Sequence, residues 1–297
     1  MLNFLCPPAL AHEFEAIPSV DIPANVWWTW RLEWGALLIL ALAGWGYYQL
    51  WQYAKNQLKL ETAQKLDKKK AAYFFSGLAL IYIAIASPID SVGEQYLFSV
   101  HMFQHNLFMY PVATLLLIGI PEWMLQIVFR YWPWSETVLK KLAHPIPACL
   151  LFNLIFGVWH VPYLYDWALK DRMVHNLEHL TFVLSALLMW MPVRSPLLNL
   201  RLSHGFQMLY IGALTIAQIP VFAFVTFSRT VLYQTYELAP RLTTLTARGD
   251  QQLGGVLMKL TGMLVFSIAF ILIFMAWYRA DKDQENNPQL KTRPHFN

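Results

Sequence analysis

The sequence predicts an all-α integral membrane protein with seven transmembrane helices, an extracytoplasmic N-terminus and a cytoplasmic C-terminus. Hydrophobic residues make up 57% of the 297 residues and charged residues only 13%, whereas soluble domains carry about 25% charged residues. The mean hydropathy is positive. The apolar residues also gather in stretches long enough to cross a bilayer as helices, with polar loops between them.

Seven such stretches follow one another, with no internal repeat and no soluble domain between them. They cover residues 34–51, 71–87, 100–120, 147–163, 175–191, 206–227 and 253–278. We therefore expect one membrane domain over residues 34–278. An extracytoplasmic segment at 1–33 precedes it, and a polar cytoplasmic tail at 279–297 follows it. An odd number of spans places the two termini on opposite sides of the membrane.

Lysine and arginine residues predict the orientation. If the loop at 52–70 is cytoplasmic, 15 of the 22 basic residues fall on the cytoplasmic side and 7 on the outer side. Short cytoplasmic loops carry the excess of Lys and Arg in membrane proteins. The multi-pass topology is therefore predicted to be N-out and C-in.

The N-terminal segment combines a signal-like start with an aromatic cluster. Residues 1–11 end in Ala-Leu-Ala before His12, as a signal peptide would, but they have neither the basic start nor the long apolar core of a signal. The segment is then either part of a signal or an extracytoplasmic stub. Tryptophan favours the membrane–water interface, so we expect an interfacial anchor at Trp27, Trp28, Trp30 and Trp34.

Five of the nine histidines lie where predicted helices meet the outer face. His101 and His105 form one His-x-x-x-His pair at the start of the third span, and His175 and His179 form a second at the start of the fifth. Residues four apart project from the same face of a helix. His160 lies at the outer end of the fourth span. Neutral imidazole binds copper, zinc, iron and nickel, so the sequence predicts a metal site with these five histidines as ligands.

The ordinary role of a single histidine at a helix end is an interfacial hydrogen bond. Here five histidines from three helices are predicted at one depth on one side of the membrane. Polar groups in or beside hydrocarbon are costly and tend to mark function. We therefore interpret the five together as a binding site.

Other residues near that face are candidates for supporting roles. A metal-binding histidine commonly donates its second ring N–H to a carboxylate, and Asp250 and Glu178 are candidates for that role or for direct ligation. Met102 is a further candidate ligand, because thioether sulfur binds Cu(I) well. For Asp250, a negative charge at a helix N-terminus is an equally good interpretation.

Lys259 either pairs with Glu178 or extends toward the interface. Further carboxylates on this face are Asp90, Glu94 and Asp166.

The composition argues against two classes of function. The two cysteines, Cys6 and Cys149, have no C-x-x-C spacing, which argues against metal transfer through thiolates within the chain. The sequence has no basic stripe with interleaved aromatic residues and no glycine-rich phosphate loop. No nucleic-acid partner is therefore expected.

A series of short motifs runs through the predicted membrane domain. They are Ser87-Pro88-Ile89-Asp90, His101-Met102-Phe103-Gln104-His105, Gly119-Ile120-Pro121, Trp159-His160-Val161-Pro162-Tyr163-Leu164-Tyr165-Asp166, His175-Asn176-Leu177-Glu178-His179 with Trp190 and Pro192, and Asp250-Gln251-Gln252-Leu253-Gly254-Gly255. In this order, over residues 35–278, they resemble the multi-helix CtaG family of cytochrome c oxidase assembly factors, which serves caa-type oxidases. Lys259 departs from the family pattern, in which an apolar or aromatic residue is expected.

The resemblance implies a bacterial plasma-membrane protein without catalytic turnover. Its implied partners are the subunits of a haem–copper oxidase and the lipid bilayer. The implied task is delivery of copper to the oxidase, for which the predicted histidine site would hold the ion.

Three other classes compete with a copper-binding assembly factor. A haem-binding membrane oxidoreductase would use histidines from facing helices as axial ligands, although both members of an i,i+4 pair lie on one face of a haem. A zinc hydrolase would need a His-Glu-x-x-His motif, whereas Glu178 directly precedes the second histidine of its pair. A transporter would place polar residues near the bilayer midplane. The haem enzyme is the main alternative.

Overall fold

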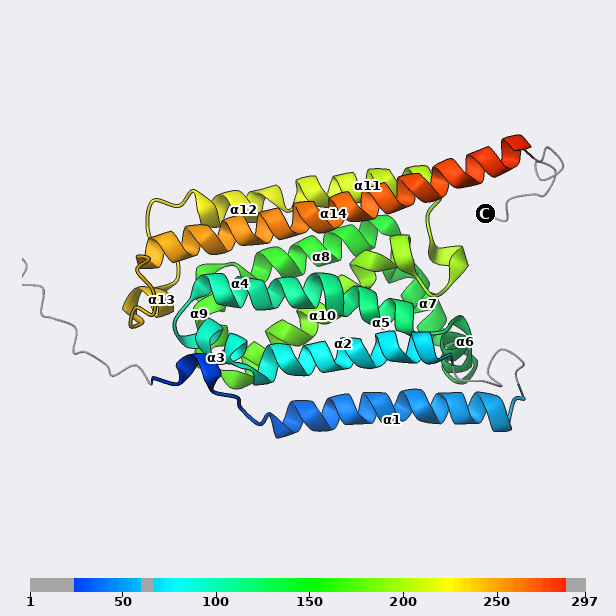
Figure 1. Cartoon of the computed structure of the whole chain (residues 1–297), viewed down its shortest axis with the longest axis horizontal. Coiled ribbons are helices and arrows are strands. Elements are labelled where there is room, and N and C mark those ends of the chain that lie inside the picture. Colours follow the sequence, from blue (N-terminus) through cyan, green and yellow to red (C-terminus); the bar gives the residue numbers. More distant parts are fainter. Residues whose placement is uncertain (1–23, 60–66, 287–297) are drawn as a thin grey trace, which may run out of the picture.

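The fold is a bundle of long α-helices that run along one common direction (Figure 1). The computed structural model describes residues 24–59 and 67–286, and every regular element within them is helical. The predictions for His12, for the signal-like start and for the end of the tail lie outside the described residues.

The longer helices are α1 (Trp34–Asn56), α2 (Lys68–Ala86), α8 (Pro145–Trp159), α10 (Arg172–Arg194), α11 (His204–Ala217) and α14 (Ala247–Asn286). One further long helix consists of α4 (Phe98–Leu107), the π-helix η3 (Phe108–Val112) and α5 (Ala113–Gly119). The shorter elements are η1 (Val26–Trp28), α3 (Pro88–Gln95), α6 (Glu122–Tyr131), α7 (Pro133–Leu142), α9 (Pro162–Lys170), η4 (Leu198–Leu200), α12 (Ile219–Thr226) and α13 (Gln234–Leu238).

Several of these helices are suited to cross a membrane. In the described part of the chain, four stretches are long and apolar enough: α2, α10, the joined α11 and α12, and α14. The number rises to six if each of two bent pairs forms one span; these are α4–α5 with α6, bent by 79°, and α7 with α8, bent by 77°. These helices support the predicted class, an all-α membrane protein. Seven spans and their orientation stay a prediction.

Short elements gather at the two ends of the bundle (Figure 1). At one end, called the α13 end, lie α3, α9 and α13, and α4, α10 and α14 begin there. At the opposite end, called the α6 end, lie α6 and α7. Because α4 and α10 begin at the same end, their first turns lie at similar depth in the bundle. Those turns carry the two histidine pairs.

The core lies between α4, α8, α10 and α14. Phe98, Phe152, Phe182 and Met189 are fully buried in it. Large apolar side chains are also exposed on the outward faces of the bundle. Examples are Leu38, Leu150, Leu209 and Leu264. Soluble monomers rarely expose apolar surface on this scale, so the outward faces fit contact with lipid.

The tryptophans of the predicted anchor are exposed at the α13 end. They are Trp27, Trp28, Trp30 and Trp34, in and around η1 and the start of α1. Their exposure agrees with an interfacial position, which stays a prediction.

A π-helix interrupts the long helix that carries the first histidine pair. It spans Phe108–Val112 and contains Pro111. Proline has no backbone N–H to donate and clashes with the preceding turn of an α-helix, so the wider π turn accommodates it. The interruption begins three residues after His105. Single π turns of this kind are frequent at functional sites.

The last helix is longer than the predicted span. α14 continues past Tyr278 to Asn286, so the first part of the predicted polar tail at 279–297 is helical. Arg279 and Asp283 are four residues apart in this extension, a spacing at which opposite charges stabilise a helix.

We expect Gly119→Ala to destabilise the bundle by about 1–3 kcal/mol. Gly119 ends α5 where that helix packs against α2, and a Cβ at this position would lie 2.4 Å from the backbone nitrogen of Phe74. Because the obstacle is backbone, the two helices must move apart. The measurement is the midpoint of thermal unfolding in detergent. Gly212→Ala in α11 is the matched control, since a Cβ there meets nothing within 4 Å. Equal losses in both variants would contradict the close α2–α5 packing.

Candidate metal centre

The two histidine pairs lie on the facing sides of α4 and α10. His101 and His105 lie one turn apart on α4, and His175 and His179 lie one turn apart on α10. All four side chains are buried. The ring centroids of His101 and His179 are 5.9 Å apart, and those of His105 and His179 are 5.7 Å apart. The tertiary structure therefore brings the two predicted pairs together.

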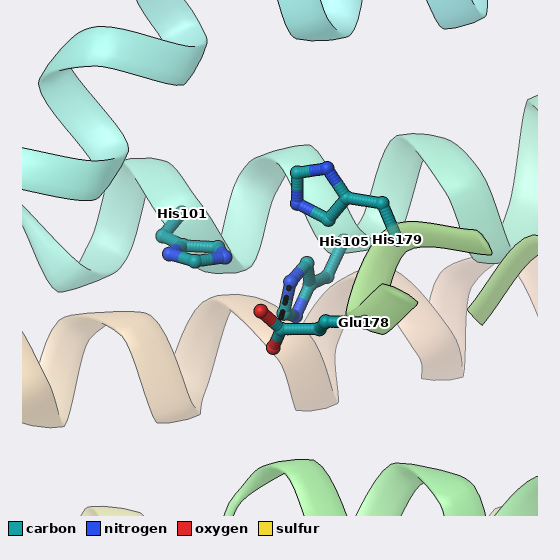
Figure 2. Close-up of side chains that lie close together, drawn as sticks. All are labelled: His101, His105, Glu178 and His179. Carbon is teal, nitrogen blue, oxygen red and sulfur yellow. Dashed lines mark ion pairs between the residues drawn. The ribbon is translucent and has the colours of Figure 1, made fainter. Parts of the chain in front are cut away.

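A buried carboxylate joins three of these histidines. Glu178 on α10 is fully buried, and its Oε1 lies 3.5 Å from Nε2 of His105. His101, His105, Glu178 and His179 each offer one ligand atom, and these atoms all lie within 4.8 Å of one another. Figure 2 shows the four side chains converging between α4 and α10. We call these four residues the histidine–carboxylate cluster.

The ligand atoms of this cluster have few hydrogen-bond partners. Buried atoms without one, in the part of the chain that the structure describes, include Nε2 of His101, both ring nitrogens of His105, both carboxylate oxygens of Glu178 and Nε2 of His179. Buried polar groups in proteins are nearly always partnered, and an unpaired buried charge is strongly unfavourable. A cation between the four side chains would satisfy these atoms together. Imidazole ligands with one carboxylate fit copper, zinc, iron or nickel.

A second group of possible ligands adjoins the cluster through His179. Asp90, His175 and His179 also offer ligand atoms that all lie within 4.8 Å of one another. Nδ1 of His175 lies 2.8 Å from Oε1 of Glu94, whereas its Nε2 has no hydrogen-bond partner. The other oxygen of Glu94 accepts a hydrogen bond from Arg31 across 3.2 Å. Because Arg31 and Glu94 are partly exposed, these contacts connect the buried histidines with the surface at the α13 end.

The two acids of α3 differ in their affinity for a proton. Burial raises the pKa of Asp90, and the negative charge of Glu94 raises it further. Burial also acts to raise the pKa of Glu94, but the hydrogen bond and charge of His175, with the charges of Arg31 and Arg172, bring it below its usual value. Glu94 is therefore the ionised acid at neutral pH, and Asp90 is the one that more readily holds a proton.

A tyrosine hydroxyl sets the tautomer of His101. Nδ1 of His101 lies 3.2 Å from the hydroxyl of Tyr236 in α13, and that hydroxyl donates its only proton to the carbonyl oxygen of Gly93 at 2.7 Å. The Tyr236 oxygen must then accept from Nδ1–H of His101, and it also accepts from the hydroxyl of Tyr165 at 2.9 Å. Nε2 of His101 keeps its lone pair, which is the form that binds a metal. Outer hydrogen bonds of this kind orient metal-binding histidines.

His160, a predicted ligand, belongs to neither group and lies beside the cluster, in contact with Met102, a second predicted ligand. The ring centroid of His160 is 6.3 Å from that of His105. Nε2 of His160 lies 3.4 Å from Sδ of Met102. Both side chains are buried.

Lys259 makes a different contact from the two that the sequence suggested. Its Nζ donates to the backbone carbonyl of Thr215 in α11, at 2.8 Å. This bond ties α14 to α11. Glu178 instead contacts His105, with 3.5 Å between Oε1 and Nε2.

Asp250 lies at the N-terminus of α4, outside both ligand groups. Its Oδ2 accepts a hydrogen bond from the backbone N–H of Phe98 at 2.7 Å, and its Oδ1 accepts from the N–H and the hydroxyl of Ser99. α4 begins at Phe98, so Asp250 satisfies the free N–H groups of its first turn. This position agrees with the interpretation as a negative charge at a helix N-terminus, because Asp250 lies in the first turn of its own helix α14 and also binds the first turn of α4.

Asp250→Ala is expected to lower the free energy of unfolding by about 0.5–2 kcal/mol, as the loss of a helix cap does. The stoichiometry of metal binding should stay as in the wild type, because both ligand groups keep all their members. Asp250→Asn keeps one acceptor oxygen and should recover part of the stability. Thermal unfolding and elemental analysis of the purified variants test this. Lost metal with unchanged stability would instead identify Asp250 as a ligand.

Two residues of the site could not be assigned from the sequence. From the sequence, Asp90 is only one of several carboxylates on the outer face of the membrane. Its approach to His175 and His179 depends on α3 folding back onto α4. Gly93 permits this approach, since a Cβ there would lie 3.0 Å from Cα of His101. One available signal is Gln104, a polar residue inside an apolar span, which donates to Asp90 at 2.8 Å. Tyr236 lies in the short helix α13, far along the chain, and no signal in the sequence marks it as part of the site.

Residues 45–280 match the family model described as cytochrome c oxidase caa3 assembly factor. No curated protein and no solved structure matches the chain. The matched range contains the whole histidine–carboxylate cluster, and it confirms the resemblance that the motifs indicate. Because the match covers well over half of the sequence, the chain belongs to the family of cytochrome c oxidase caa3 assembly factors.

Proposed function

We propose that the protein binds a copper ion in the histidine–carboxylate cluster and delivers it to a subunit of a haem–copper oxidase during assembly. The observation that carries this proposal is the set of buried ligand atoms without hydrogen-bond partners on His101, His105, Glu178 and His179. The family supplies the setting, because a haem–copper oxidase must receive copper while it is assembled.

The charges around the cluster suit a cation. Glu178 brings a carboxylate into a set of imidazoles, and Glu94 brings a second one to His175. A buried charge is strongly unfavourable unless it is paired, so Glu178 favours a bound cation. Imidazole and carboxylate hold Cu(I) less tightly than sulfur ligands do. A site that releases its ion readily suits delivery.

The route from the surface to the cluster runs past Glu94. A cation that arrives at the α13 end meets the partly exposed carboxylate of Glu94 first and His175 next. His179 belongs to both ligand groups, so an ion can pass from the second group to the cluster by exchanging one ligand at a time.

The proposed topology has seven spans, N-out and C-in, in a bacterial plasma membrane. α1 is the first span: its 23 residues extend about 34 Å, against a hydrocarbon core of about 30 Å. Its side chains Leu38 and Ile39 are exposed as lipid contact requires. With this orientation the α13 end is extracytoplasmic, and the partner oxidase would receive copper there.

The direct test is elemental analysis, with an absorption spectrum, of the full chain purified in detergent before and after copper loading. We expect copper at near-integral stoichiometry and no haem band. A haem band would move the protein to the membrane oxidoreductases, and neither copper nor haem would contradict the proposal. His144→Ala is the control, because His144 is exposed between α7 and α8 and belongs to neither ligand group; a loss of copper in this variant would reveal binding at the surface.

A further inference from the structure

His160 and Met102 form a contact that lies outside the two ligand groups. His160 follows the end of α8, and Met102 lies on α4 between the histidines of the first pair. Nε2 of His160 is 3.4 Å from Sδ of Met102, and both residues are almost completely buried. The hydroxyl of Tyr233 donates to the backbone carbonyl of His160 at 3.1 Å, which anchors the chain at this position.

The tautomer of His160 follows from its other nitrogen. Nδ1 lies 2.6 Å from the backbone carbonyl oxygen of Phe156. A carbonyl oxygen can only accept, so Nδ1 carries the proton, and neutral imidazole has no second one. Nε2 therefore presents a lone pair to Met102. A doubly protonated ring would place an unpaired charge in the core, because no ion pair of His160 is found among the described residues; such a charge is strongly unfavourable.

Two electron-pair donors thus face one another with no proton between them. Thioether sulfur has no proton to give and is only a weak acceptor. For metal–nitrogen and metal–sulfur bonds of about 2.0 and 2.3 Å, as zinc shows, a 3.4 Å separation corresponds to an angle at the metal of roughly 100°. That angle is close to tetrahedral, so one ion can bind both atoms without a large movement of either side chain.

From this geometry we infer a second, softer copper site formed by Nε2 of His160 and Sδ of Met102, which takes Cu(I). The inference rests on the proposed function, since it gives the delivered ion a second binding site within the protein. Thioether ligands select Cu(I) over the harder divalent ions. The His160–Met102 site therefore differs from the histidine–carboxylate cluster in having a sulfur ligand.

His105 connects the two sites. Met102 and His105 are three residues apart on α4 and so lie on neighbouring positions of one helix face. The ring of His105 is 6.3 Å from that of His160, and neither of its nitrogens has a hydrogen-bond partner. His105 is therefore the shared third ligand through which Cu(I) moves between the cluster and the sulfur site. This movement exchanges ligands only, and copper stays Cu(I) throughout.

X-ray absorption at the copper edge, on the full chain in detergent loaded with one equivalent of Cu(I), tests the inference. We expect a sulfur scatterer beside the nitrogen shell in the wild type and its loss in Met102→Leu, which changes side-chain volume little. The affinity of Met102→Leu for Cu(I), measured by competition with a chelator, should fall at least about tenfold. Loss of a residue that only hydrogen-bonds a metal ligand already lowers metal affinity by about that factor. Met109→Leu is the matched control, because Met109 is buried two turns further along the same helix. His160→Gln should also lose the sulfur scatterer.

Selenomethionine-labelled wild type gives the same information without a substitution. A selenium scatterer is expected in place of the sulfur one, and its absence would overturn the inference even if Met102→Leu does not fold. Copper bound at stoichiometry with only nitrogen and oxygen scatterers would overturn the sulfur site and leave the proposed function in place. A wild type that binds no copper would overturn both.

Discussion

The combined variant His105→Ala and His179→Ala is expected to lose bound copper and to leave the partner oxidase without it. Each histidine contributes a ligand atom to the cluster from a different helix, His105 from α4 and His179 from α10. Loss of a single outer partner lowers metal affinity 10- to 100-fold, so removal of two direct ligands should lower it by at least about 100-fold. Each single variant should show a smaller loss.

The measurements are the copper content of the purified variant and the copper content and activity of the oxidase from cells that carry it. Circular dichroism and the yield of purified protein establish that the variant folds, and His144→Ala controls for the loss of a histidine as such. Wild-type copper in the double variant would rule out the cluster as the site. Lost copper in the variant with a fully active oxidase would separate binding from delivery and contradict the delivery role.

Glu178→Gln is expected to stabilise the copper-free protein and to remove most of the stabilisation that copper gives. Without metal, the Glu178 carboxylate is fully buried and both of its oxygens lack a hydrogen-bond partner. An amide of the same shape cannot ionise, and its N–H can donate to Nε2 of His105, which lies 3.5 Å from Oε1 of Glu178; relief of an unsatisfied buried group is worth about 1–3 kcal/mol. The melting temperature of the copper-free variant should therefore rise above that of the wild type.

With copper the effect has the opposite sign. An ion present at about 1,000 times its dissociation constant stabilises the native state by about 4 kcal/mol, and a hundredfold weaker affinity reduces this to about 1.4 kcal/mol. Thermal unfolding with and without copper measures both quantities. Glu122→Gln on α6 is the matched control, since that carboxylate is partly exposed and accepts a hydrogen bond from Gln126 at 3.2 Å. A copper-free Glu178→Gln variant that is less stable than the wild type would mean that the carboxylate serves the fold.

Local periodicity in the sequence was sufficient to identify the members of the cluster that share a helix. His101 with His105, and His175 with His179, have a spacing that places both side chains on one helix face in any fold that keeps the helix. Glu178 follows His175 by three residues and so lies on the same side of α10. The membrane class likewise follows from composition and from the length of the apolar stretches.

Contacts between segments far apart in the chain were decided by the tertiary structure alone. The hydrogen bond from Tyr236 to Gly93 joins residues 143 positions apart, and the contact of Asp250 with Ser99 joins residues 151 positions apart. The sequence predicts His160 and Met102 as ligands, but not that they lie beside the cluster as a pair. Side chains facing lipid and side chains facing the core of a membrane bundle are both apolar. The hydrophobic pattern therefore determines which segments form helices and at what depth their polar residues lie. It does not determine which helix faces pack against one another, and those helix–helix contacts decide which ligands can share an ion.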